Sequence, residues 1–220
     1  MKIRNLEELE EHLDLTLAWR KKELYILSSS MLQVDETGQS IENISIIRAG
    51  YLFLYAHWEG YIRDASNYYL VYLSNKNIKN KFLKHSFNYL YVKNNLKNTL
   101  DSKKNFPFIK FMNIVDDSYN KPFFVKYTND NRQVPITTDS NLNYEKLTDI
   151  LTSLSLKNNY ELIQNFLDHD LLSIRNSIAH GEDQEVSYAE FIETRDKIFD
   201  IIDEFTTQLI TSAENECYLK

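Results

Sequence analysis

The segment from Arg175 to Gly181, with the sequence Arg-Asn-Ser-Ile-Ala-His-Gly, has the side chains of this chain best suited to chemistry. Histidine exchanges protons near neutral pH, and the planar guanidinium of arginine can hold a phosphate through two parallel hydrogen bonds. Arg175 and His180 are about 140° apart around a helix, whereas Asn176 and His180 share a face. A long arginine side chain can still swing toward the histidine at a helix end. The pattern fits phosphate chemistry, and it also fits a simple salt bridge and helix cap.

A polar stripe in the most apolar part of the chain supplies the next candidates. Its members follow steps of four, three, four and four and therefore lie on one face of a helix: Arg48, Leu52, Tyr55, Glu59 and Arg63. Charges in an apolar helix are costly unless they are paired or used. Glu59 is a candidate acid, or an orienter of Arg175, and its alternative is a helical ion pair with Arg63. Arg48, on the same stripe, is a candidate for binding RNA.

Helical periodicity predicts the elements that position these residues. The first predicted helix is amphipathic and covers about 5–30, and the second covers 41–74. The second is apolar almost all round, which predicts a central position. Three further helices are predicted over 147–154, 159–180 and 188 to about 213. Gly181 is a suitable C′ residue, and Ser187 with Glu190 has the spacing of a capping box. Gly50 and Gly60 within the second helix indicate close packing of another helix. The chain is thus an all-α bundle of four main helices.

The connection between the second and third of these helices differs in composition. Residues 76–126 carry eleven lysines and three aspartates, a net charge of +8, which leaves −15 for the rest of a chain whose total is −7. Ten aromatic residues and two of the three prolines also lie there. Lysines interleaved with aromatic residues can neutralise phosphates and stack unpaired bases, so Lys103, Lys104 and Lys110 are candidate RNA contacts. The alternative is a solvated face with a small core of its own. We treat 76–142 as an insertion and connection within a single domain of residues 1–220.

Composition excludes several classes of protein. With four glycines and three prolines, the sequence has neither a Gly-rich phosphate loop nor a nucleophile elbow. One cysteine, Cys217, rules out a disulfide framework or a Cys-rich zinc site and favours a reducing compartment. No signal peptide and no membrane-spanning segment is expected, so we expect a cytoplasmic protein. No second cluster completes a metal site with Asp168-His169-Asp170, and no metal or cofactor is expected. His57 is expected to be a satisfied core histidine, and His12 and His85 are expected at the surface.

Four segments together resemble a known family. Arg175–Gly181 resembles the R-x4–6-H motif of the HEPN superfamily, in which a polar residue often follows the arginine. Tyr51–Gly60, with its Trp-Glu-Gly, resembles the corresponding helix of the MAE-type branch of bacterial HEPN-like nucleases. Arg20–Leu24 and Ile136–Leu142 are also similar to that branch. The resemblance covers most of the chain except the basic insertion.

This resemblance implies a HEPN-like helical bundle and a metal-independent endoribonuclease. In that family the ribose 2′-OH attacks the adjacent phosphate. His180 would then act as base or acid, Arg175 would stabilise the phosphoryl charge, and Asn176 would orient the phosphate or His180. The resemblance also implies a homodimer with a composite active site, and a toxin or defence role with an antitoxin or neighbouring-gene protein as a possible partner. The alternative is a catalytically silent HEPN module that binds a partner protein or a nucleotide.

Overall fold

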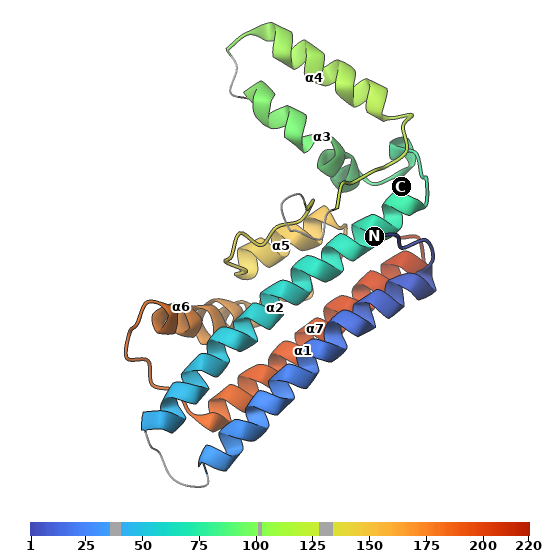
Figure 1. The fold of residues 1–220 in the computed structure, drawn as a ribbon. Coiled ribbons are helices and arrows are strands. Elements are labelled where there is room, and N and C mark those ends of the chain that lie inside the picture. Colours follow the sequence, from blue (N-terminus) through green and yellow to red (C-terminus); the bar gives the residue numbers. More distant parts are fainter. Residues whose placement is uncertain (36–40, 101–102, 128–133) are drawn as a thin grey trace.

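Three long helices form the body of the protein in the computed structural model, which describes residues 1–35, 41–100, 103–127 and 134–220 (Figure 1). They are α1 (Leu6–Asp35), α2 (Ile41–Asn75) and α7 (Tyr188–Glu214). α1 runs antiparallel to the other two, and α2 and α7 run parallel to each other. The described residues contain helices and two isolated β-bridges but no strand, so the predicted all-α fold is confirmed. None of the described helices combines the length and the apolarity that crossing a lipid bilayer requires.

α2 is the central helix, as its all-round apolar sequence predicts. Its buried tyrosines also carry hydroxyl groups, which need partners inside the core. Tyr61 shares a hydrogen bond of 2.5 Å with Thr206, and Tyr69 shares one of 2.8 Å with Ser212. Because both partners belong to α7, these pairs fix the register between the two parallel helices.

The two glycines of α2 lie where α1 comes close. A Cβ added at Gly50 would overlap the Met31 side chain and come 3.1 Å from the ring of Phe191 in α7. A Cβ at Gly60 would lie 3.2 Å from Nη2 of Arg20. The expectation that these glycines permit close packing is therefore confirmed.

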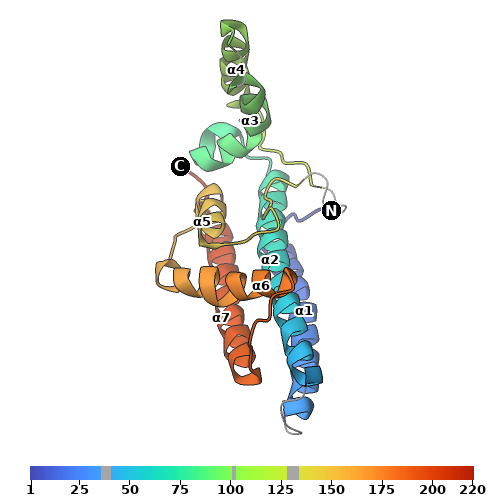
Figure 2. The same cartoon turned by 90° about the vertical axis from the view of Figure 1, so that its left-hand side faces the viewer.

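A shorter layer crosses the long helices. It contains the 3₁₀ turn η2 (Glu161–Ile163), the π-helical segment η3 (Phe166–Ser173) and α6 (Ile174–Ala179), and Figure 2 shows α6 lying across α2 and α7. The prediction of one α-helix over 159–180 is wrong, because a 3₁₀ turn and a π-helical segment precede a short α-helix there. The buried side chains are spaced five apart, in the pairs Phe166–Leu171 and Leu167–Leu172. That spacing matches the i→i+5 repeat of a π-helix, which brings both pairs to the core.

The basic insertion forms an arm at one end of the bundle (Figure 1). It contains the short 3₁₀ helix η1 (Asn80–Phe82), α3 (His85–Leu100) and α4 (Asn105–Ser118). The C-terminal residues hold its base through two backbone bonds. The N–H of Lys84 donates to the carbonyl of Tyr218, and the N–H of Lys220 donates to the carbonyl of Phe82.

A buried side chain of α2, Asn67, binds the segment that returns from the arm. The amide of Asn67 donates to the carbonyl of Ile136 at 2.9 Å and accepts from the N–H of Ile136 at 3.1 Å. The same amide also donates to the carbonyl of Arg63. Asn67 therefore positions residues 136–142, which lead into α5 (Tyr144–Ser153).

We predict that Asn67→Ala lowers the free energy of unfolding by about 2–4 kcal/mol, because two buried backbone groups of Ile136 lose their partner. Urea unfolding measures the loss, and the amide of Ile136 should exchange its hydrogen faster. The matched control is Asn75→Ala, which removes an exposed amide bonded only to Val71 of its own helix. Equal effects of the two substitutions would contradict the proposed clamp.

Candidate functional site

The end of α6 has a fixed geometry. The N–H of His180 donates to the carbonyl of Asn176, that of Gly181 to Ile178, and that of Glu182 to Ser177. These bonds form a Schellman motif with Gly181 at C′, where φ is +81°. The prediction that Gly181 ends the helix is confirmed, and the motif sets the position of His180 immediately before it.

Arg175 lies against the core with most of its donors unused. Its guanidinium carbon is 4.4 Å from the centroid of the Tyr55 ring, a cation–π contact. Its Nη1 donates to Oδ1 of Asn176 at 2.6 Å. Among the described residues no carboxylate lies within ion-pair distance of Arg175. The side chain is thus oriented but not neutralised, a state suited to an incoming anion.

His180 is exposed at the C-cap of α6. In the described part of the chain no hydrogen bond engages its ring, and none joins it to Arg175. The side chain of Asn176 orients Arg175 rather than the histidine. The three motif residues therefore share one helix end that faces solvent.

Tyr55 connects this helix end to Glu59. Its buried hydroxyl accepts a hydrogen bond of 2.5 Å from the N–H of Leu142. Burial, and next the negative charge of Glu59, raises the pKa of Tyr55 to about 12, while Arg175 opposes the shift. Glu59 thus acts on the phenol that supports Arg175. No ion pair joins Glu59 to Arg63 among the described residues, and Arg63 binds Asp64 at 3.0 Å instead.

Arg48 lies beside the residues that follow the motif. Its Nη1 is 3.2 Å from Oδ1 of Asp183, and its Nη2 donates to the carbonyl of Glu182. It therefore ties α2 to the turn after His180. The stripe predicted on α2 does meet the motif, with Arg48 at the turn and Tyr55 beneath Arg175.

The comparisons with known proteins were made against family models, curated proteins and solved structures. A family model described as "HEPN_MAE_28990:/-like HEPN" matches residues 9–218. The chain belongs to the HEPN superfamily. No curated protein and no solved structure matches it significantly.

Other candidate residues of this HEPN chain lie away from the end of α6 or have a structural role. Lys103, Lys104 and Lys110 lie at or near the start of α4, in the arm that projects away from α6 (Figure 1). Oδ1 of Asp168 accepts a 2.8 Å hydrogen bond from the N–H of Tyr144 at the start of α5. It therefore holds the beginning of that helix.

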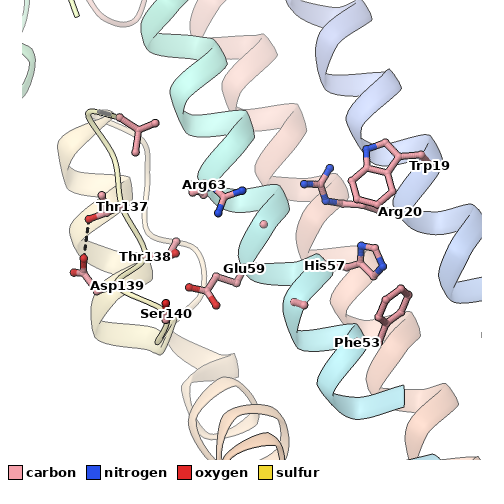
Figure 3. Close-up of a pocket in the computed structure, with 13 residues that line it drawn as sticks. Trp19, Arg20, Phe53, His57, Glu59, Arg63, Thr137, Thr138, Asp139 and Ser140 are labelled. Atoms are coloured by element: carbon pink, nitrogen blue, oxygen red, sulfur yellow. Dashed lines mark hydrogen bonds between the residues drawn. The ribbon is translucent and has the colours of Figure 1, made fainter. Parts of the chain in front are cut away.

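His57 is buried as expected, but its ring is not satisfied. Nε2 is 3.2 Å from Oε2 of Glu23 without hydrogen-bond geometry. Burial lowers the pKa of His57, and Glu23 opposes that shift. His57 lines a groove that the sequence analysis did not predict (Figure 3). Its walls come from segments more than a hundred residues apart in the sequence. Three segments that resemble the HEPN branch contain lining residues, namely those with Arg20, with Glu59 and with residues 136–142, but the resemblance did not indicate a groove.

We predict that Gly181→Ala destabilises the HEPN fold by about 1–2 kcal/mol. A Cβ at this position meets no atom within 4 Å, so the cost is the left-handed backbone alone. Asn tolerates this backbone better, so Gly181→Asn should cost less. Thermal unfolding of the two variants measures the difference. An unchanged melting temperature in Gly181→Ala would show that the Schellman motif does not set this helix end.

Proposed function

We propose that this HEPN protein is a metal-independent endoribonuclease with Arg175 and His180 at its active site. The observation that carries the proposal is the guanidinium of Arg175, which rests on the Tyr55 ring, is bonded to Asn176 and has no carboxylate partner in the described part of the chain, five residues from an exposed histidine. In the transition state, negative charge grows on the non-bridging oxygens of the phosphate. A positioned cation that no carboxylate neutralises stabilises that charge. Membership of the HEPN superfamily supports the same assignment.

The proposed reaction is an in-line attack of a ribose 2′-OH on the adjacent phosphorus. The 2′-oxygen loses its proton to a base as the new O–P bond forms, and the bond to the 5′-oxygen breaks. An acid returns a proton to that 5′-oxygen, so the products are a 2′,3′-cyclic phosphate and a free 5′-OH. His180 serves as base or acid, and Arg175 stabilises the charge on the non-bridging oxygens. Asn176 orients Arg175, and Glu59 acts as an acid or as an orienter through Tyr55.

We further propose that two chains form the active unit. The reaction needs both an acid and a base, whereas each chain offers one exposed motif histidine. A symmetric homodimer would bring two motifs to one axis and complete the site. Its solution mass would be twice the 26.1 kDa of the chain. A cytoplasmic toxin or defence effector, held inactive by an antitoxin or the product of a neighbouring gene, is the role that fits such an activity.

We predict that the purified protein cleaves single-stranded RNA in EDTA and that His180→Ala and Arg175→Ala each abolish cleavage. Arg175→Lys should restore little, because an ammonium lacks the planar fork. Gel analysis of the cleaved RNA, with product ends determined by mass spectrometry, measures the outcome. Leu15→Ala, which alters an exposed side chain of α1, is the control.

Two results would contradict this assignment. Cleavage that disappears in EDTA and returns with magnesium would exclude the metal-independent mechanism. Wild-type cleavage by a folded His180→Ala variant would exclude the site.

The arm supplies a proposed second contact for RNA. Lys103, Lys104 and Lys110 are exposed, and Phe106 and Phe108 beside them are 72% and 43% exposed. Cations with exposed rings suit an unpaired strand. Since the arm projects from the far end of the bundle, it would hold RNA at a distance from Arg175 (Figure 1).

We predict that replacing Lys103, Lys104 and Lys110 with alanine weakens RNA binding for all sequences alike. Each lost phosphate contact should reduce the slope of log K against log salt by about 0.7. Binding titrations at several salt concentrations measure the slope, and turnover of bound RNA should change little. An unchanged slope would reassign the arm to a protein partner.

One observation favours the alternative function, in which the protein is a catalytically silent module that binds a partner protein. α4 exposes a run of large apolar side chains that includes Ile109 and Met112, and of its residues only Ser118 is buried. Exposed apolar surface of this kind marks interaction sites. An antitoxin or other partner protein would be the occupant.

A further inference from the structure

A groove of about 620 Å³ crosses α2 between α1 and residues 137–140 (Figure 3). Its floor is formed by Ala56 and Gly60, two small residues one helical turn apart. Trp19 and Phe53 stand on the α1 side, and residues 137–140 form the opposite wall. A volume of this size is typical of pockets for small organic ligands.

Two residues that line the groove have a buried nitrogen without a hydrogen-bond partner in the described part of the chain. Arg20 is 4% exposed, and its Nη1 and Nη2 bind Thr16 and Asp64, while its Nε has no hydrogen-bond partner. A Cβ built on Gly60 would lie 3.8 Å from this Nε, so the atom borders the floor. Nε2 of His57, which is 6% exposed, also lacks a hydrogen bond. Buried polar atoms without partners are costly. Both nitrogens are fully buried, so they border the groove without opening into it.

The α1 side of the groove offers flat apolar surfaces. Trp19 is 46% exposed and Phe53 is 40% exposed, although both lie beside the buried ring of His57. Both rings contact His57 edge-on, with centroid distances of 5.2 and 4.4 Å. The guanidinium of Arg20 lies 4.3 Å from the Trp19 centroid and holds that ring in place. Rigid exposed rings of this kind stack planar ligands.

The charges in the groove favour a planar ring with amino groups over a phosphate. Arg20 and Arg63 share the carboxylate of Asp64, which offsets one of their two positive charges, and the negative charge of Glu59 in the same groove offsets the other. The carboxylate of Asp139 is occupied by Thr137 and Lys146. Among the described residues, Glu59 is the lining carboxylate without an ion-pair partner. A half-buried carboxylate accepts hydrogen bonds from an exocyclic amino group.

We propose that the groove binds an unpaired nucleobase with an exocyclic amino group, stacked on Trp19 or Phe53 and read by Glu59. This inference rests on the proposed function, because it assigns the base to the strand whose phosphate lies at Arg175. Tyr55 supports the connection, since its ring lies under Arg175 and Glu59 is one turn away on α2. The groove would then select the sequence that is cut. Uracil presents a carbonyl in place of the amino group and is disfavoured.

The test uses short 2′-O-methyl oligocytidine and oligouridine, which lack the attacking hydroxyl and stay intact. Fluorescence anisotropy with the wild-type protein should show tighter binding of oligocytidine. Trp19→Ala should weaken that binding roughly 10- to 100-fold, the effect of one lost base–aromatic stack. Glu59→Gln should reduce the preference for oligocytidine, because an amide both donates and accepts. The control is Tyr25→Ala, since Tyr25 is an exposed ring of α1 that packs on Phe199 outside the groove.

Phe53→Ala tests the same surface from α2 if Trp19→Ala does not fold. Unchanged affinity in the folded groove variants, or an unchanged preference in Glu59→Gln, would overturn the proposal. Cleavage of ordinary RNA is measured separately with the same variants. A protein that cleaves RNA but binds both oligomers without regard to the groove refutes the groove alone. A protein that shows the Trp19-dependent preference without cleaving retains the binding site and loses the ribonuclease assignment.

Discussion

The contact between Arg175 and Tyr55 is the interaction on which the arrangement of the site depends. Tyr55 is buried in α2, its ring supports the guanidinium, and its hydroxyl binds the backbone of Leu142. One side chain thus joins the central helix, the motif helix and the segment before α5. A tyrosine phenol is neutral at physiological pH, and burial and Glu59 raise the pKa of Tyr55 further, to about 12, so the cation of Arg175 is held without being neutralised. A carboxylate in that position would have formed an ion pair and left less positive charge for a substrate.

This arrangement explains why α2 combines an apolar sequence with isolated polar residues. The helix is the centre of the core, so each polar group on it needs a partner. The hydroxyls of Tyr61 and Tyr69 find theirs in α7, and the amide of Asn67 finds its partner in the backbone of Ile136. Each such bond contributes about 1 kcal/mol, whereas leaving it unmade costs about 1–3 kcal/mol. The exceptions on α2 are the buried ring nitrogens Nε2 of His57 and Nε1 of Trp58, which have no hydrogen-bond partner among the residues that the structure describes, and Nε of Arg20 on α1 shares that property.

Local sequence signals predicted a large part of this fold. The long helices follow from apolar periodicity, and the ends of the motif helix and of α7 follow from Gly181 and from the Ser187–Glu190 capping box. The π-helical segment was missed because its five-residue repeat differs little from a helical one in so short a stretch. The clamp of Asn67 on Ile136 joins residues 69 positions apart, and no local rule anticipates such a pair. The groove was not predicted for the same reason, because its walls are distant in the sequence. The four-residue spacing of Glu59 and Arg63 suggested an ion pair between them, whereas Arg63 pairs with Asp64.

The charge distribution limits where RNA can approach. Outside residues 76–126 the chain carries a net charge of −15, so most of the bundle repels a polyanion. Repulsion between exposed charges is screened over about 8 Å at physiological salt, which leaves the local charges to decide binding. Arg175, which has no carboxylate partner among the described residues, would attract a phosphate more strongly than the groove, where Asp64 and Glu59 offset the two arginines. A strand placed by these charges would set its phosphate on α6 and direct a base toward α2, which is the orientation that cleavage next to a selected base requires.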